Sequence, residues 1–145
     1  MKNSILRLWL AGTTIVLLAA CGGEKKEEAA PAEASPASNA DIKPAKDGKV
    51  IEVELYSNET GNFFKPNEIT ANAGDVIKFE LKSGVHNVNF FADSNPGRSG
   101  LPKASDMLQL PDQEYRVYVG WAPGKYYFQC DPHALLGMKG HVTVK

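Results

Sequence analysis

The chain contains 145 residues and carries a formal net charge of −1. Its 16 lysines and arginines nearly balance 17 aspartates and glutamates, and no basic stripe appears, so a nucleic-acid partner is excluded. No strongly acidic face can be inferred either, and only two cysteines are present, Cys21 and Cys130.

The first twenty residues have the pattern of an export signal. Lys2 and Arg7 provide positive charge, and the apolar stretch 8–20 is shorter than the about 20 residues that a membrane span takes. Small residues then lead to Cys21, in an order that resembles a bacterial lipobox, where the cysteine is acylated after cleavage. We therefore expect a lipoprotein signal peptide at 1–20, with Cys21 as a membrane anchor. An ordinary signal peptide is the alternative.

Residues 21–47 are predicted to form a lipid-anchored, disordered linker. Ala, Pro, Glu, Lys and Ser dominate this segment, which has no aromatic residue and Ile42 as its one large aliphatic. Such a composition cannot bury enough apolar area to offset the entropy lost on ordering. A flexible coil of this length spans roughly 30 Å, enough for a head domain to swivel between partners near a membrane. The alternative is a spacer that provides clearance only.

Residues 48–145 are predicted to form one all-β domain, because this length suits one core and period-two alternation recurs along it. The inward positions of the alternation are Ile51, Val53, Leu55, Ile77, Phe79, Leu81, Tyr115, Val117, Val119, Val142 and Val144. Turn signals rich in Gly, Pro and Asn separate the runs. We expect an antiparallel Greek-key sandwich or barrel, with room for a helical turn at 102–110.

A thiol, an imidazole and a thioether lie close together in the sequence near the C-terminus. They belong to Cys130, His133 and Met138. By period two, Cys130 shares a face with Tyr126 and Phe128, which suit the core, so its thiol should point inward where the strand ends. An unpaired cysteine in an exported domain is exposed to oxidation and mispairing, and metal ligation is a reason to keep one.

A histidine far upstream is the candidate fourth ligand. His86 shares a face with Val88 and Phe90 by the same rule, so it can meet the cysteine of another strand. A thiolate, two imidazoles and a weak axial thioether form the donor set of a blue copper site. Zinc sites rarely use methionine, and iron–sulfur clusters need more thiolates. Each residue taken singly has a packing explanation, but the four together predict one mononuclear copper.

The sequence of this region resembles a known family. Cys-x-x-His-x-x-x-x-Met at 130–138, followed by Lys-Gly-His-Val-Thr-Val at 139–144 and preceded by His86-Asn87-Val88, is similar to the plastocyanin and pseudoazurin branch of the cupredoxins, the type 1 blue copper proteins. The resemblance covers 49–145. It implies a cupredoxin-like fold and a carrier, not an enzyme, that cycles between Cu(II) and Cu(I) without a small-molecule substrate.

Three residues beside the ligands are expected to influence the copper. Asn87 either bonds across to the Cys130 loop or is only a turn asparagine. Pro132 has no N–H, so one hydrogen bond to the Cys130 sulfur is absent. Asp131 stands where a small hydroxyl residue often follows the cysteine in the family, and its negative charge should favour Cu(II) and lower the potential.

The resemblance also implies a docking surface. His133 would lie at the surface as the electron port, beside an apolar patch from Leu135 and Leu136. We expect one of these leucines to be exposed and the other to pack over the copper. The expected partners are redox proteins, such as a cytochrome, an oxidase or a reductase. Gln129 replaces the tyrosine that plant plastocyanins have before the copper cysteine, which argues against photosynthetic-type docking there.

The predicted function is one-electron transfer by a monomer in the bacterial cell envelope, on the periplasmic side. A copper-trafficking or storage lipoprotein is the alternative, but such sites tend to be rich in Met or His, and this chain has three methionines and three histidines. An oxidase or nitrite reductase needs further copper ligands, and the remaining His141 is expected to be exposed. Met107 is expected to serve packing, and a redox-silent binding module would not need all four ligands.

Overall fold

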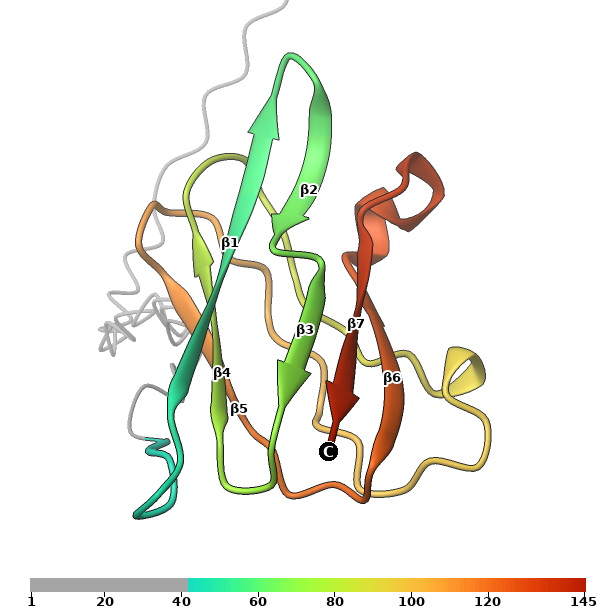
Figure 1. Cartoon of the computed structure of the whole chain (residues 1–145). Helices are drawn as coiled ribbons and strands as arrows, with labels where there is room; N and C mark the ends of the chain where they lie inside the picture. The colour runs from blue at the N-terminus through green and yellow to red at the C-terminus, as the bar shows by residue number, and fades with distance from the viewer. Residues whose placement is uncertain (1–41) are drawn as a thin grey trace, which may run out of the picture. The chain divides into compact units, whose positions relative to one another are not determined.

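The structure, a computed structural model, describes residues 42–145 (Figure 1). The predicted signal peptide at 1–20, the predicted lipidation site Cys21 and the linker as far as residue 41 lie outside the described residues. In the part of the chain that is described, no helix has the length and apolar character needed to cross a membrane.

The described residues form seven strands and two 3-10 helices, which confirms the all-β prediction. In chain order they are β1 Val50–Asn58, β2 Gly61–Lys65, β3 Glu68–Ala71, β4 Val76–Leu81, η1 Ala92–Ser94, β5 Glu114–Tyr118, β6 Gly124–Gln129, η2 Asp131–Leu136 and β7 Lys139–Val144. The helical turn considered for 102–110 is absent: this segment has no helical residue, and its Leu108 forms a bridge with His86.

The strands form two mixed sheets, with the orders β2-β1-β4-β5 and β3-β7-β6 (Figure 1). Two pairs, β1·β4 and β3·β7, are parallel, so the expectation of a purely antiparallel sandwich is wrong. The reason is a crossover: after the β1–β2 hairpin the chain passes to the other sheet as β3 and returns as β4 beside β1. A parallel neighbour requires such a longer connection, which alternation within one strand does not reveal.

The alternating positions behave as predicted. Nine of the eleven inward residues are buried and the other two, Ile51 and Tyr115, are partly buried against the same core. Alternation does not reveal β2 and β3, because these strands have only five and four residues.

An aromatic cluster anchors the strand that leads to the cysteine. The ring of Phe128, on β6, lies edge-on to Phe64 and Phe79, with centroid distances of 4.9 and 5.3 Å. Tyr126, two residues earlier, is also buried and lies against Trp121 at 4.8 Å. These contacts secure β6 against the four-stranded sheet, so that the end of the strand is held firmly for the residue that follows it.

The last residues of the predicted linker contact the domain. The Ala45 N–H donates to the Gly74 carbonyl at 2.8 Å, and the Gly48 N–H donates to the Ala45 carbonyl at 2.9 Å. The Ile42 carbonyl accepts from the Arg116 guanidinium at 3.4 Å. Contacts with the domain therefore begin at least six residues before Gly48.

Candidate metal centre

Residues 130–138, here called the ligand loop, begin where β6 ends. Pro132 lies in the first turn of η2, where a missing N–H costs nothing, and Gly137 ends the helix with φ of 95°. The loop closes on itself, because the Cys130 N–H donates to the Met138 carbonyl and the Met138 N–H to the His133 carbonyl, each at 3.1 Å. Three predicted ligands are thereby held within one short, hydrogen-bonded loop.

His86 reaches the same place from residues 83–90, here called the His86 segment. This segment contains no regular strand, contrary to the predicted alternation, and its only β-type pairings are two isolated bridges. His86 exchanges two backbone hydrogen bonds with Leu108, at 3.1 and 2.7 Å, and Asn89 exchanges two with Gln129, both at 2.9 Å. The side chains of His86, Val88 and Phe90 are nevertheless buried, as the pattern predicted.

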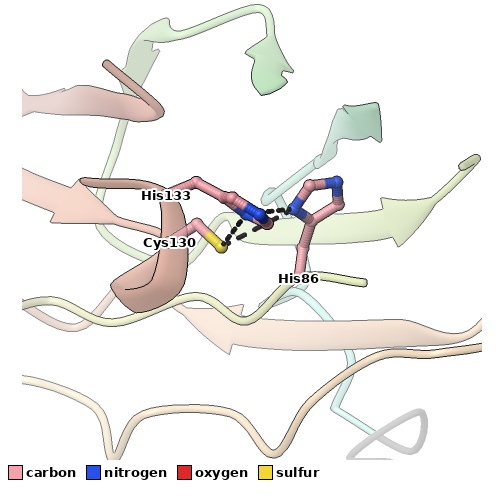
Figure 2. Close-up of side chains that lie close together, drawn as sticks. All are labelled: His86, Cys130 and His133. Atoms are coloured by element: carbon pink, nitrogen blue, oxygen red, sulfur yellow. Dashed lines mark hydrogen bonds between the residues drawn. The ribbon is translucent and has the colours of Figure 1, made fainter. Parts of the chain in front are cut away.

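The three strongest donors converge on one point (Figure 2). The Nδ1 atoms of His86 and His133 are 3.1 Å apart, and the Cys130 Sγ lies 3.6 Å from the former and 3.3 Å from the latter. His86 and Cys130 are fully buried, whereas His133 is partly exposed. In the sequence, His86 lies 44 positions before Cys130 and His133 lies 3 positions after it, and the fold brings the three side chains together.

These separations fit a single metal ion. Two ring nitrogens bound at roughly 2.0–2.1 Å are at most about 4.2 Å apart, and a thiolate bound at roughly 2.3 Å is at most about 4.4 Å from such a nitrogen. All three measured distances lie below these limits. The donors can therefore surround one ion without rearrangement of the fold.

The hydrogen bond on the far edge of the His86 ring determines which ring nitrogen is available to bind a metal ion beside Cys130. Nε2 of His86 lies 3.1 Å from the Ser83 carbonyl oxygen, which can only accept a hydrogen bond. Nε2 therefore carries the ring hydrogen, and Nδ1 presents its lone pair toward Cys130. Such an outer hydrogen bond is usual for a metal-binding histidine, because it fixes both tautomer and orientation.

Burial favours the neutral forms of both buried donors. It lowers the pKa of His86, and the neighbouring His133 lowers this pKa further. Burial likewise raises the pKa of the Cys130 thiol, against hydrogen bonds from the backbone of Asn87 and His133 that lower it. A metal that binds here has to displace the thiol proton, so its affinity should increase with pH.

Met138 completes the predicted set. Its side chain is fully buried in the same core cluster as Cys130, and its backbone bonds to Cys130 and His133 fix its position beside them. With the thioether, the four residues His86, Cys130, His133 and Met138 are arranged as a type 1 copper site, the soft donor set that distinguishes copper from zinc here.

Asn87 links the two segments. Its Nδ2 donates to Asp131 Oδ2, and its Oδ1 accepts from the Asp131 N–H, both at 2.8 Å. The bond across to the Cys130 loop is therefore present. Asn89 and Gln129 also donate to the Asp131 carboxylate. Burial opposes the ionisation of Asp131, but these hydrogen bonds from Gln129, Asn87 and Asn89 outweigh it and lower the pKa.

Both leucines of the ligand loop are exposed. The relative exposure of Leu135 is 100% and that of Leu136 is 71%, so the expectation that one of them packs over the site is wrong. The reason is η2, which has no buried residue and directs both side chains away from the core. The partly exposed His133 belongs to the same helix.

The remaining candidates lie apart from the three donors. His141 is partly exposed and its Nδ1 lies 2.8 Å from Glu68 Oε1, across the β3·β7 pair. Sequence reasoning missed Ser57, whose hydroxyl lies 3.1 Å from His86 Nε2. No local signal points to Ser57, because it lies 29 residues upstream on β1 and only the fold brings it to the ring.

Known proteins share this fold and this site region. Residues 51–145 match the sequence model of a family described as copper binding proteins, plastocyanin/azurin family. The chain is 39% identical over 99 residues to plastocyanin of Vicia faba, a match that covers 65% of this chain and 99% of that protein. It is 38% identical over 96 residues to chloroplastic plastocyanin of Oryza sativa subsp. indica, covering 64% of this chain and 62% of that protein.

A solved structure gives the same result. A pseudoazurin from Sinorhizobium meliloti is similar, with a TM-score of 0.55 and 28% sequence identity, over 67% of this chain and 74% of that one.

Proposed function

Since this chain belongs to the copper-binding plastocyanin/azurin family, we propose that it is a one-electron carrier with one copper ion held by His86, Cys130, His133 and Met138. The observation that carries this proposal is the convergence of three donor atoms within 3.1–3.6 Å of one another. When bound, copper supplies the Cu(II)/Cu(I) couple, and no substrate bond is made or broken.

The protein's part is to hold the donors still. Cys130 follows a strand anchored by aromatic packing, and His86 is held on both sides by backbone bonds to Leu108 and by its own ring bond to Ser83. Donors that are held in one arrangement need little movement when the charge at the centre changes by one unit. A small rearrangement favours fast electron transfer.

The geometry favours an electron carrier over a copper-trafficking or storage protein. His86, Cys130 and Met138 are fully buried, whereas release of an ion to another protein calls for exposed donors. The one further histidine of the described residues, His141, is bonded to Glu68 and offers no second copper centre. On the ground of its family, the chain is proposed to act as a carrier rather than an enzyme.

Electrons are proposed to enter and leave through His133. Its ring is partly exposed, and the exposed side chains of Leu135 and Leu136 lie on the same 3-10 helix. Such an apolar patch can exclude water when a redox partner docks, which brings the partner close to the ring. The partner is proposed to be a redox protein, and the carrier to act as a monomer.

We place the protein outside the cytoplasm of a bacterium. The proposal rests on the signal-like sequence of residues 1–20 and on Cys21, which would carry lipid and anchor the chain to a membrane. The linker that follows would let the copper domain move between partners. Mass spectrometry of the membrane-extracted protein tests this: an acylated N-terminal Cys21 supports it, and an unmodified mature chain contradicts it.

The electron-transfer proposal is tested by copper loading. Native protein with Cu(II) should show strong thiolate-to-copper absorption in the visible range and should lose and regain it through repeated reduction and oxidation. Cys130→Ser should abolish the colour. His141→Gln, which removes a histidine away from the donors, is the matched control and should keep it. A colourless native protein, or one that releases copper instead of cycling, contradicts the proposal.

A further inference from the structure

The His86 ring has backbone hydrogen-bond partners in Ser83 and Tyr56, and it also contacts one side-chain hydroxyl, that of Ser57. Nε2 lies 3.1 Å from the Ser83 carbonyl and also 3.1 Å from the Ser57 hydroxyl. Ser57 is near the end of β1, next to Tyr56 on the same strand. A side chain from the four-stranded sheet therefore touches the far edge of a buried ligand ring.

The direction of the Ser57 hydroxyl follows from its second partner. Ser57 Oγ lies 2.5 Å from Asn62 Oδ1, so its hydrogen points to Asn62 and its lone pairs face the His86 ring. The opposite arrangement would have Ser57 donate to Nε2 and would place the ring hydrogen on Nδ1, where Cys130 lies. Nδ1 is thus left without a hydrogen when Nε2–H donates to the Ser57 hydroxyl and the Ser57 hydroxyl donates to Asn62 Oδ1.

The surroundings are built to hold this arrangement. Ser57 and Asn62 are directly paired across the β1–β2 hairpin. The Ser57 N–H donates to the Ser83 carbonyl and hydroxyl, both at 3.0 Å, and the Ser83 hydroxyl donates to the Ser57 carbonyl at 2.7 Å. A Cβ at Gly84 would lie 2.1 Å from Ser57 Oγ and 2.8 Å from His86 Nε2, so only glycine permits the close approach.

We propose that Ser57, oriented by Asn62, is a positioning residue that fixes the His86 ring and strengthens Nδ1 as a donor, and so shifts the balance between the two oxidation states of the bound copper. This inference rests on the proposed function. A hydrogen-bond acceptor on Nε2–H increases the electron density of the ring, and a more basic ligand stabilises the more highly charged ion. Ser57 therefore favours Cu(II).

Ser57→Ala removes this acceptor and leaves the Ser83 carbonyl in place. We expect Cu(II) affinity to fall about tenfold relative to Cu(I) affinity, the lower end of the range for outer partners of metal-binding residues. For a one-electron couple this corresponds to a rise of about 59 mV in the midpoint potential. Ser57→Thr keeps the hydroxyl, so its midpoint potential should stay close to that of the native protein.

The experiment compares Ser57→Ala, Ser57→Thr, Asn62→Ala and the matched control Ser83→Ala, whose hydroxyl touches Ser57 but not the His86 ring. Redox titration gives the midpoint potential. Independently, nitrogen NMR of the metal-free and Cu(I) proteins gives the exchange rate of the His86 Nε2 hydrogen, which should rise at least severalfold in Ser57→Ala. Asn62→Ala should shift both quantities in the same direction by less, and it tests the inference if Ser57→Ala does not fold.

Two outcomes would overturn the inference: unchanged potential and exchange rate in Ser57→Ala, or equal changes in Ser83→Ala. Failure of the proposed function is a separate result, since native protein would then show no thiolate-to-copper absorption at all.

Discussion

The ligand loop and the His86 segment bring donors to one point by different means. The ligand loop carries three of the four ligands within nine residues and is closed by its own backbone bonds and by η2. The His86 segment has no regular structure and is held by bonds to residues as distant as Ser57 and Gln129. The ligand loop is therefore stabilised by local contacts and the His86 segment by tertiary contacts. Substitutions far from the site should affect the His86 segment more.

The largest difference in unfolding free energy should appear between variants of two glycines that have similar positive φ values. Gly84, in the His86 segment, has φ of 89° and Ser57 in its way, whereas Gly137, in the ligand loop, has φ of 95° and open space around it. Gly137→Ala should cost about 1–2 kcal/mol of unfolding free energy from backbone strain alone. Gly84→Ala should cost about 3–4 kcal/mol, because overlap adds to the strain. Denaturant unfolding measures both free energies. Equal losses in the two variants would contradict the idea that the two segments are packed differently.

Breaking the link between the segments should have the next largest effect. Asn87→Ala removes two hydrogen bonds to Asp131, one of them to its carboxylate, and should cost about 2–3 kcal/mol. Copper binding should weaken as well, because His86 is then less firmly placed. Asn89→Ala is the control: it removes exposed contacts to the same carboxylate and should cost less than about 1 kcal/mol. Thermal unfolding with and without copper separates the two variants.

Asp131→Asn removes a negative charge at the point where the segments meet, together with one of the two oxygens that accept from the amides of Asn87, Asn89 and Gln129. The lowered pKa of Asp131 keeps its carboxylate ionised at neutral pH, where a negative charge favours Cu(II). The midpoint potential should rise by tens of millivolts, which is a several-fold change in relative affinity at about 59 mV per decade. Glu52→Gln removes an equal charge, paired with Lys78 on the neighbouring strand of the four-stranded sheet, and should leave the potential unchanged. A fall in Asp131→Asn would contradict the idea.

The exposed leucines should give the smallest effect on stability. Leu135→Ser and Leu136→Ser should each change the unfolding free energy by less than about 0.5 kcal/mol, because neither side chain is packed. Electron-transfer rates with a natural redox partner should fall while the midpoint potential stays the same. Val50→Ser, at the start of β1, is the control for an exposed apolar residue at the other end of the strand from Ser57. Unaltered rates in both leucine variants would exclude the patch as a docking surface.

Much of the domain was predictable because its signals are short in range. Alternation identified the inward faces of β1, β4 and β7, since side-chain direction depends only on the pleat of the strand. The same rule placed the Cys130 thiol inside. It could not identify the short strands β2 and β3 or the parallel pairs, which depend on how distant segments meet.

The sequence by itself determined the kind of metal, because the number and softness of the donors are properties of residue types and their spacing. Tertiary structure alone decided which nitrogen of His86 faces the cysteine, that Asn87 ties the two segments together, that both loop leucines reach solvent, and that Ser57 touches the ring. The physical reason is that ligand identity is written along the chain, whereas hydrogen-bond direction and exposure arise only where separate strands and loops pack against one another.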